Sequence, residues 1–193
     1  MYRKVLRDAR FFELLLRIDQ EESERVRLAR CPHCGGPLHD GHFSRKPRGI
    51  LLGAGELPEG FEVRFDWCCG RCRKRTLPES VRFLARKVYL AVVVAIATVV
   101  EGGSDGDARR LLRGQLGVSW KTLARWRQWW RELTGSTFWQ RIRGRLPTDL
   151  DVERLPMSLL ESLQGEAATR LLDLLELLGP LTGSVPVTLE EGS

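Results

Sequence analysis

The chain has 193 residues, of which 42% are hydrophobic and 29% charged, and this composition is typical of a globular protein rather than of a disordered or fibrous one. Its formal net charge of +6 is unevenly distributed. Residues 81–147 carry 13 basic and four acidic side chains, whereas residues 148–193 carry two basic and nine acidic ones. A basic middle followed by an acidic tail is typical of nucleic-acid-binding proteins, and it predicts double-stranded DNA as the partner.

The sequence contains no segment that resembles a membrane anchor. Its most apolar run, "VYLAVVVAIATVV" at residues 88–100, has 13 residues, whereas a membrane-spanning helix needs about 20. The N-terminus is charged and lacks the small-residue cleavage site of a signal peptide. We therefore expect a buried helix at residues 88–100 and a cytoplasmic protein whose thiols stay reduced, so that clustered cysteines bind metal.

In chain order, the first two segments are expected to differ in structure. Residues 1–30 are predicted to form one N-terminal helix over about residues 5–28, because apolar side chains recur there near helical spacing. Residues 31–80 are rich in glycine, proline, cysteine and arginine, and contain short alternating stretches such as "FEVRF". This composition and alternation predict small β-hairpins and turns, with "RKPRGILLGAGELPEG" as an inserted loop.

Four cysteines of this second segment form two CxxC pairs. "CPHCGG" contains Cys31 and Cys34, and "CGRC" contains Cys69 and Cys72. Zinc prefers four tetrahedral ligands, and a two-residue spacer lets a tight turn direct two sulfurs at one ion. The 34 residues between the pairs exceed the usual spacing of about 15–20, which the inserted loop explains. We predict a structural Zn²⁺ site in a small zinc ribbon.

The ligand set leaves alternatives open. Cys68 can replace Cys69 through a CxxxC spacing, although Cys69 is favoured because it restores CxxC. The histidines are alternative ligands that a four-cysteine set does not need: His33, His39 and His42. A catalytic zinc site usually has three protein ligands and an open position, so a structural site is favoured. A thioredoxin-like redox site is disfavoured, because no βαβ pattern surrounds either CxxC.

Residues 81–147 are predicted to form a helix-turn-helix domain of three helices, over about residues 81–100, about residues 105–115, and from Ser119 onward. The third helix lies in "GVSWKTLARWRQWWREL", where Ser119 occupies the N-cap position. Its apolar stripe is expected to face the core: Leu123, Trp126, Trp130 and Leu133. The second helix of such a motif enters the major groove of DNA.

The remaining faces of this third helix suit nucleic acid. We expect base and phosphate contacts from Lys121, Thr122, Arg125 and Gln128, since arginine binds guanine and glutamine binds adenine through paired hydrogen bonds. Arg127 and Arg131 are expected on phosphates, and Trp120 and Trp129 fit the core stripe poorly. The segment "SRKPR" supplies a second predicted DNA contact through Arg45, Lys46 and Arg48. The alternatives are a solvated helix of a plain bundle and a charged loop.

Residues 148–193 form an acidic, leucine-rich tail. "SLLESL" and "RLLDLLELL" predict two short helices separated near Gly165. We expect residues 155–178 to pack on the N-terminal helix or on another subunit, because that packing buries their leucines. A homo-oligomer is one of these two options.

Taken together, "CPHCGGPLH", "RKPRG", "CCGRCRKRTLPESVRFLARKVYL" and "GVSWKTLARWRQWWREL" resemble small zinc-ribbon plus helix-turn-helix proteins of bacterial mobile elements. They are similar to the N-terminal DNA-binding part of insertion-sequence transposases over about residues 31–135. The resemblance implies recognition of element DNA, with a transposase or recombinase as a candidate protein partner. Only 60 residues follow Leu133, which is short for an RNase-H-like nuclease, and no spaced Asp/Asp/Glu set emerges.

We therefore expect a non-catalytic, zinc-containing DNA-binding protein, mainly α-helical with a small β zinc ribbon. One alternative is a transcription regulator of the same fold. The other is an adaptor that binds protein partners through its zinc ribbon and C-terminal helices.

Overall fold

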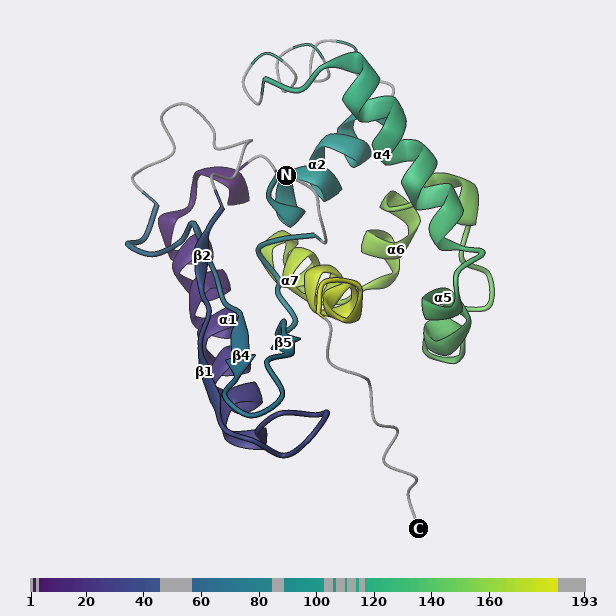
Figure 1. Ribbon diagram of the computed structural model, residues 1–193. Coiled ribbons are helices and arrows are strands. Elements are labelled where there is room, and N and C mark those ends of the chain that lie inside the picture. The colour runs from purple at the N-terminus through teal and green to yellow at the C-terminus, as the bar shows by residue number, and fades with distance from the viewer. Residues whose placement is uncertain are drawn as a thin grey trace.

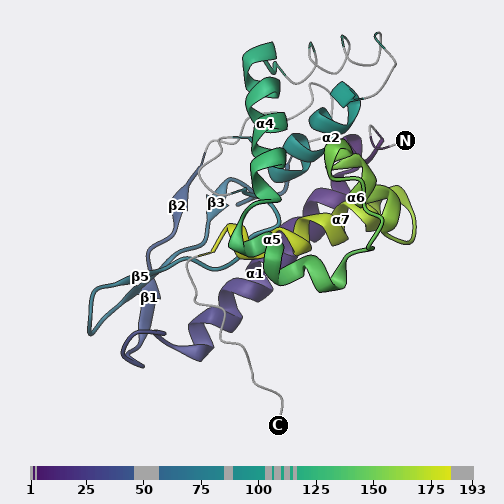
Figure 2. The same ribbon diagram turned by 90° about the vertical axis from the view of Figure 1, so that its right-hand side faces the viewer.

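The computed structural model describes residues 2, 4–45, 57–84, 89–102, 106, 110, 114 and 117–183. The chain is mainly helical with a small antiparallel sheet, as predicted (Figure 1). The strands lie alongside the long N-terminal helix, and the remaining helices gather to one side of that helix and the strands (Figures 1 and 2). No helix in the described ranges is long and apolar enough to cross a membrane.

The N-terminal segment forms a 3-10 turn, η1 (Val5–Arg7), followed by α1 (Ala9–Ala29). Asp8 separates the two, because its side chain caps α1 by accepting a hydrogen bond from the backbone N–H of Arg10 at 3.0 Å. The predicted helix over residues 5–28 is therefore confirmed apart from this break.

The described part of the segment predicted to be β contains five short strands: β1 (Leu38–Asp40), β2 (Phe43–Ser44), β3 (Val63–Arg64), β4 (Trp67–Cys69) and β5 (Arg75–Thr76). They form a three-stranded antiparallel sheet in the order β1-β4-β5 and a separate β2-β3 pair. The indole N–H of Trp67 donates to the carbonyl and hydroxyl oxygens of Ser23 in α1, both at 3.1 Å. These bonds attach the sheet to α1.

The apolar run forms α2 (Ala91–Gly102), whose residues from Ala91 to Thr98 are buried, as expected. The helix predicted from residue 81 nevertheless begins ten residues later. Residues 81–84 run as a non-helical segment, and Phe83 makes an antiparallel bridge with Leu90. The predicted start of this helix was wrong.

A buried ion pair explains the non-helical segment. Asp19 of α1 and Arg82 are 1% and 0% exposed, and the Nε of Arg82 donates to the Asp19 carboxylate at 2.8 Å. Arg82 also donates to the backbone carbonyls of Phe61 and Val63, at 2.5 and 2.9 Å. Asp19 accepts a further bond from the backbone N–H of Val81 at 2.7 Å. These distant partners hold residues 81–84 out of a helix.

The helix predicted from Ser119 is α4 (Trp120–Leu133), and Ser119 caps it by accepting from the backbone N–H of Thr122 at 3.2 Å. The predicted core stripe is buried throughout: Leu123, Trp126, Trp130 and Leu133. This stripe packs on α2, and the ring of Trp126 meets that of Tyr89 edge to face at 5.0 Å. The helix predicted over residues 105–115 lies mostly outside the described residues.

Between residues 134 and 183 the structure contains α5 (Thr137–Ile142), η2 (Arg143–Arg145), η3 (Val152–Arg154), α6 (Met157–Ser162), α7 (Ala167–Leu177) and η4 (Gly179–Leu181). The two predicted tail helices correspond to α6 and α7, whereas α5 was not predicted. Leu171, Leu174 and Leu175 of α7 are buried in the same cluster as the phenylalanines of α1, and α7 packs on α2 and α6. The N-terminal segment, the basic middle and the tail therefore share one core.

Candidate metal centre and nucleic-acid interface

Four cysteine sulfurs lie together beyond the end of α1. The Sγ atoms of Cys31, Cys34, Cys69 and Cys72 all lie within 4.8 Å of one another. The Cys31–Cys72 and Cys34–Cys69 pairs are 3.6 and 3.5 Å apart. A tetrahedral zinc ion with Zn–S bonds of about 2.3 Å separates its sulfurs by about 3.8 Å. The four sulfurs therefore fit one tetrahedral ion with only small shifts.

The first cysteine turn (residues 31–36) is closed by backbone hydrogen bonds. The N–H of Gly35 donates to the Cys31 carbonyl at 2.8 Å, and the N–H of Cys31 donates to the Gly36 carbonyl at 3.0 Å. Gly35 has a φ of 67°, which glycine adopts without steric cost. A Cβ on Gly36 would lie 3.0 Å from the sulfur of Cys69. Gly35 therefore permits the backbone turn, and Gly36 permits the close approach of the sulfurs.

The second cysteine turn (residues 69–74) repeats this geometry. The N–H of Arg73 donates to the Cys69 carbonyl at 3.0 Å, and the N–H of Cys69 donates to the Lys74 carbonyl at 3.0 Å. Arg73 has a φ of 61°, at the position where the first turn has glycine. Two copies of one local structure thus present two sulfurs each.

Backbone donors also prepare the sulfurs for metal. The N–H groups of Cys72 and Arg71 each donate to the Cys69 sulfur at 3.4 Å and lower the pKa of that thiol to about 6. The backbone N–H of Lys74 lowers the pKa of Cys72, but burial and the neighbouring sulfurs outweigh it and raise that pKa to about 12. Zinc binds thiolates, and the backbone donors around Cys69 favour its thiolate form.

Strand geometry separates Cys69 from Cys68. Side chains alternate between the faces of a strand, so these neighbours in β4 point in opposite directions. Cys69 is buried among the other three sulfurs, whereas the Cys68 sulfur lies 3.8 Å from the Arg73 carbonyl oxygen. Cys69 therefore joins the cluster, as the CxxC spacing predicted. The three histidines lie outside it: His33, His39 and His42.

The exposed side of α4 carries most of the predicted DNA contacts: Lys121, Arg125, Arg127, Gln128 and Arg131 are all exposed. Thr122 is not, and its predicted place on this face is corrected. Its side chain is 9% exposed, and its hydroxyl lies 3.0 Å from that of Ser119. Thr122 stands four residues before Trp126, so it falls on the buried stripe.

Some of these side chains are held by neighbours on α4. The Nη2 of Arg125 donates to the Thr122 hydroxyl at 3.3 Å. Gln128 accepts from Arg131 at 3.2 Å and donates to Glu132 at 3.0 Å. The cationic groups of Lys121 and Arg127 have no hydrogen bond or ion pair with any described residue. These two are therefore the groups most available to a phosphate.

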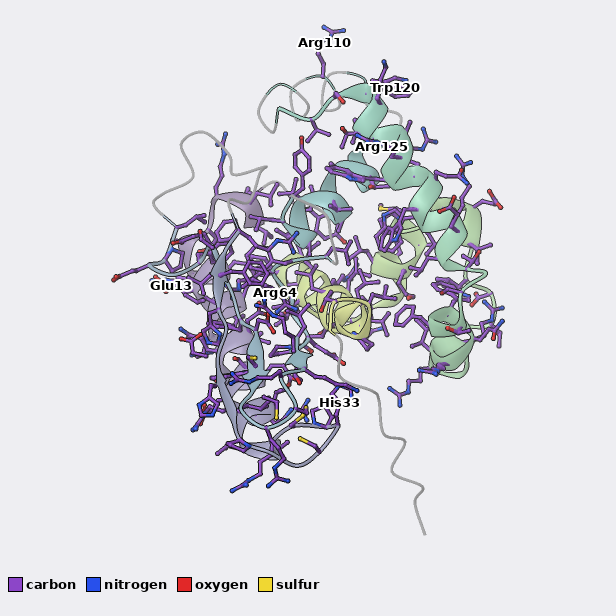
Figure 3. The ribbon with its side chains drawn as sticks, in the orientation of Figure 1. Glu13, His33, Arg64, Arg110, Trp120 and Arg125 are labelled. Atoms are coloured by element: carbon purple, nitrogen blue, oxygen red, sulfur yellow. The ribbon has the colours of Figure 1, made fainter. Side chains whose placement is uncertain are left out.

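Exposed residues outside the predicted contact set lie at the start of α4, where Trp120 was expected to fit the core stripe poorly, and beyond its end. Trp120 is 53% exposed at the first position of α4, and Figure 3 shows it at the same end of the molecule as Arg110 and Arg125. Further exposed arginines lie in and after α5: Arg141, Arg143 and Arg145. Sequence reasoning missed these three arginines, because no helix was predicted between residues 134 and 147.

The second predicted DNA contact is only partly described. The half-buried Arg45 places its guanidinium 5.5 Å from the ring centre of Phe83, and burial lowers its pKa. Its side chain therefore packs on the protein instead of extending as a free arm. Lys46 and Arg48 lie outside the described residues.

The cysteine cluster and the exposed face of α4 lie at opposite ends of the molecule. Figure 3 shows His33, in the first cysteine turn, far from Trp120 and Arg125. Comparison with protein-family models, with curated proteins and with solved structures finds no match.

Proposed function

We propose that this chain is a zinc-stabilised, non-catalytic protein that binds double-stranded DNA through the exposed face of α4. The observation that carries the proposal is the division of this helix. One face of the helix buries leucine and tryptophan side chains, and the helix begins at a capped N-terminus. Its other face exposes four cations: Lys121, Arg125, Arg127 and Arg131. Such cations neutralise DNA phosphates, and a helix of this kind reads base edges from its N-terminal end.

Zinc is the ion that suits the four sulfurs. Four protein ligands complete a tetrahedral shell and leave no open position for a substrate, so the proposed role is structural. Among the described residues, few apolar side chains surround the cluster: Val26, Leu38 and Trp67. A core of that size contributes little folding free energy on its own, and a bound metal would contribute the additional stability that the ribbon needs. The zinc ribbon thus holds the sheet beside α1.

The resemblance to proteins of bacterial mobile elements makes element DNA the proposed target and a transposase or recombinase the proposed protein partner. A transcription regulator of the same fold would use the same surface of α4. A transposase gene adjacent to the gene of this protein would favour the mobile-element protein over the regulator. The adaptor alternative has less support, because its leucine-rich surface is not free. The leucines of α6 and α7 face the core instead.

DNA binding is tested with a Lys121→Ala/Arg127→Ala double variant, titrated against a fluorescent duplex at several salt concentrations. Loss of two phosphate contacts should weaken binding and reduce the slope of log K against log salt by about 2. The control is Arg17→Ala/Arg154→Ala, which removes two exposed arginines that pair with Glu21 and Glu161. Equal affinity and slope in wild type and α4 variant would contradict the proposal.

Elemental analysis tests the metal. The purified protein should contain about one zinc ion per chain, as four-ligand sites do. Cys69→Ser should lose zinc and Cys68→Ser should retain it, because only the Cys69 sulfur joins the cluster. The opposite pattern would reverse the ligand assignment.

A further inference from the structure

Two arginines beside the cysteine cluster have an unusual backbone conformation. Among the described residues, Arg30 and Arg73 are the two non-glycine residues with positive φ, at 66° and 61°. Arg30 directly precedes Cys31 and Arg73 directly follows Cys72, and the sulfurs of these two cysteines are 3.6 Å apart. A left-handed backbone costs free energy for any residue with a Cβ, whereas glycine adopts it freely.

The molecule contains its own comparison for Arg73. Both cysteine turns make the same pair of backbone hydrogen bonds, and the first turn has Gly35 and Gly36 where the second has Arg73 and Lys74. Arg30 likewise follows the end of α1, where a left-handed residue is usually glycine. Glycine would therefore suit the backbone at positions 30 and 73, yet the chain has an arginine at each of them.

Most of the cations at the cysteine turns have no bonding partner in the described part of the protein. The side chains of Arg30, Arg73 and Lys74 are exposed and make no hydrogen bond or ion pair with a described residue. Arg71, also exposed, donates to the Cys34 carbonyl at 3.3 Å. The two cysteine turns and the residue that precedes them therefore carry four exposed cations, none of which forms an ion pair with a described acidic residue.

The metal centre accounts for only part of this charge. Four thiolates around one zinc dication would carry a net charge of about −2. Four exposed cations exceed that charge and leave a positive surface. This surface is separate from α4, because the cysteine turns and α4 lie at different ends of the molecule in both ribbon views (Figures 1 and 2).

We propose that Arg30, Arg71, Arg73 and Lys74 form a second DNA contact, which binds the phosphate backbone of a duplex segment other than the one held by α4. The identity of the partner rests on the proposed function, and the charge of the surface supplies the complementarity. One molecule then holds two duplex segments, as a protein that brings DNA sites together must do.

The test replaces both strained arginines, in Arg30→Gly/Arg73→Gly. Since glycine suits both backbone positions, the variant should keep its zinc and melt at the wild-type temperature or a few degrees above it. Its DNA affinity should fall, and its salt slope should decrease by about 2. The matched control is again Arg17→Ala/Arg154→Ala. In a second assay, an immobilised duplex charged with wild-type protein should capture a labelled second duplex, and the glycine variant should not.

The results distinguish the second DNA contact from the α4 contact and from a purely structural role of the two arginines. Zinc loss or a lower melting temperature in the glycine variant would show that the arginines serve the thiolates, and an unchanged salt slope or undiminished capture would also overturn the proposal. If only the Lys121→Ala/Arg127→Ala variant loses affinity, the function stands and the second contact fails. If only the glycine variant loses affinity, the second contact stands and the α4 assignment fails. A wild type that binds no duplex at low salt overturns both.

Discussion

Replacing Trp126 with alanine should destabilise the protein strongly. Trp126 is 4% exposed, packs on α2 and meets Tyr89 edge to face. A tryptophan buries about 150–250 Å², which at about 25 cal/mol per Å² corresponds to about 4–6 kcal/mol of unfolding free energy. Core Trp→Ala changes cost about 3–5 kcal/mol. At about 2–4 °C per kcal/mol, the melting temperature should fall by about 6–20 °C.

Arg127 is the matched control, because it is the next residue of α4 and is exposed. Arg127→Ala should change the unfolding free energy by less than about 0.5 kcal/mol and weaken DNA binding. Thermal unfolding of the zinc-loaded proteins, followed by circular dichroism, measures the first effect, and duplex titration measures the second. A Trp126→Ala variant that melts within about 2 °C of wild type would refute the packing argument. Early melting of Arg127→Ala would show that α4 faces the other way.

Two further predictions concern the metal centre and the buried ion pair. Gly36→Ala should weaken zinc binding in competition with a chromophoric chelator, because its Cβ would lie 3.0 Å from the Cys69 sulfur, whereas Gly144→Ala has open space and should bind as wild type does. Equal zinc affinity of the wild type and both variants would argue against the close approach of residue 36 to the Cys69 sulfur. Asp19→Ala should lower the unfolding free energy in urea by about 3–5 kcal/mol, because it leaves the Arg82 guanidinium buried without its carboxylate. A loss below about 1 kcal/mol would mean that other acceptors suffice for Arg82.

The parts of this protein that sequence alone determined are those set by neighbouring residues. A CxxC pair specifies its own turn, so both cysteine turns were predictable from spacing. The stripe of α4 repeats every three or four residues, and the N-cap is one side chain bonding to the next helical turn, so the core face and first residue of α4 were also correct. The two leucine-rich tail helices were predicted for the same reason.

The tertiary structure decided whatever depends on residues far apart in the chain. The pairing of Leu38 with Cys69 places Cys69, not Cys68, among the sulfurs. Asp19 delays the start of α2, because a carboxylate 63 residues away holds Arg82. Arg30 and Arg73 become neighbours of one cysteine cluster only when Cys31 and Cys72 meet. Local periodicity does not report such contacts, since they form only once the strands and helices have packed together.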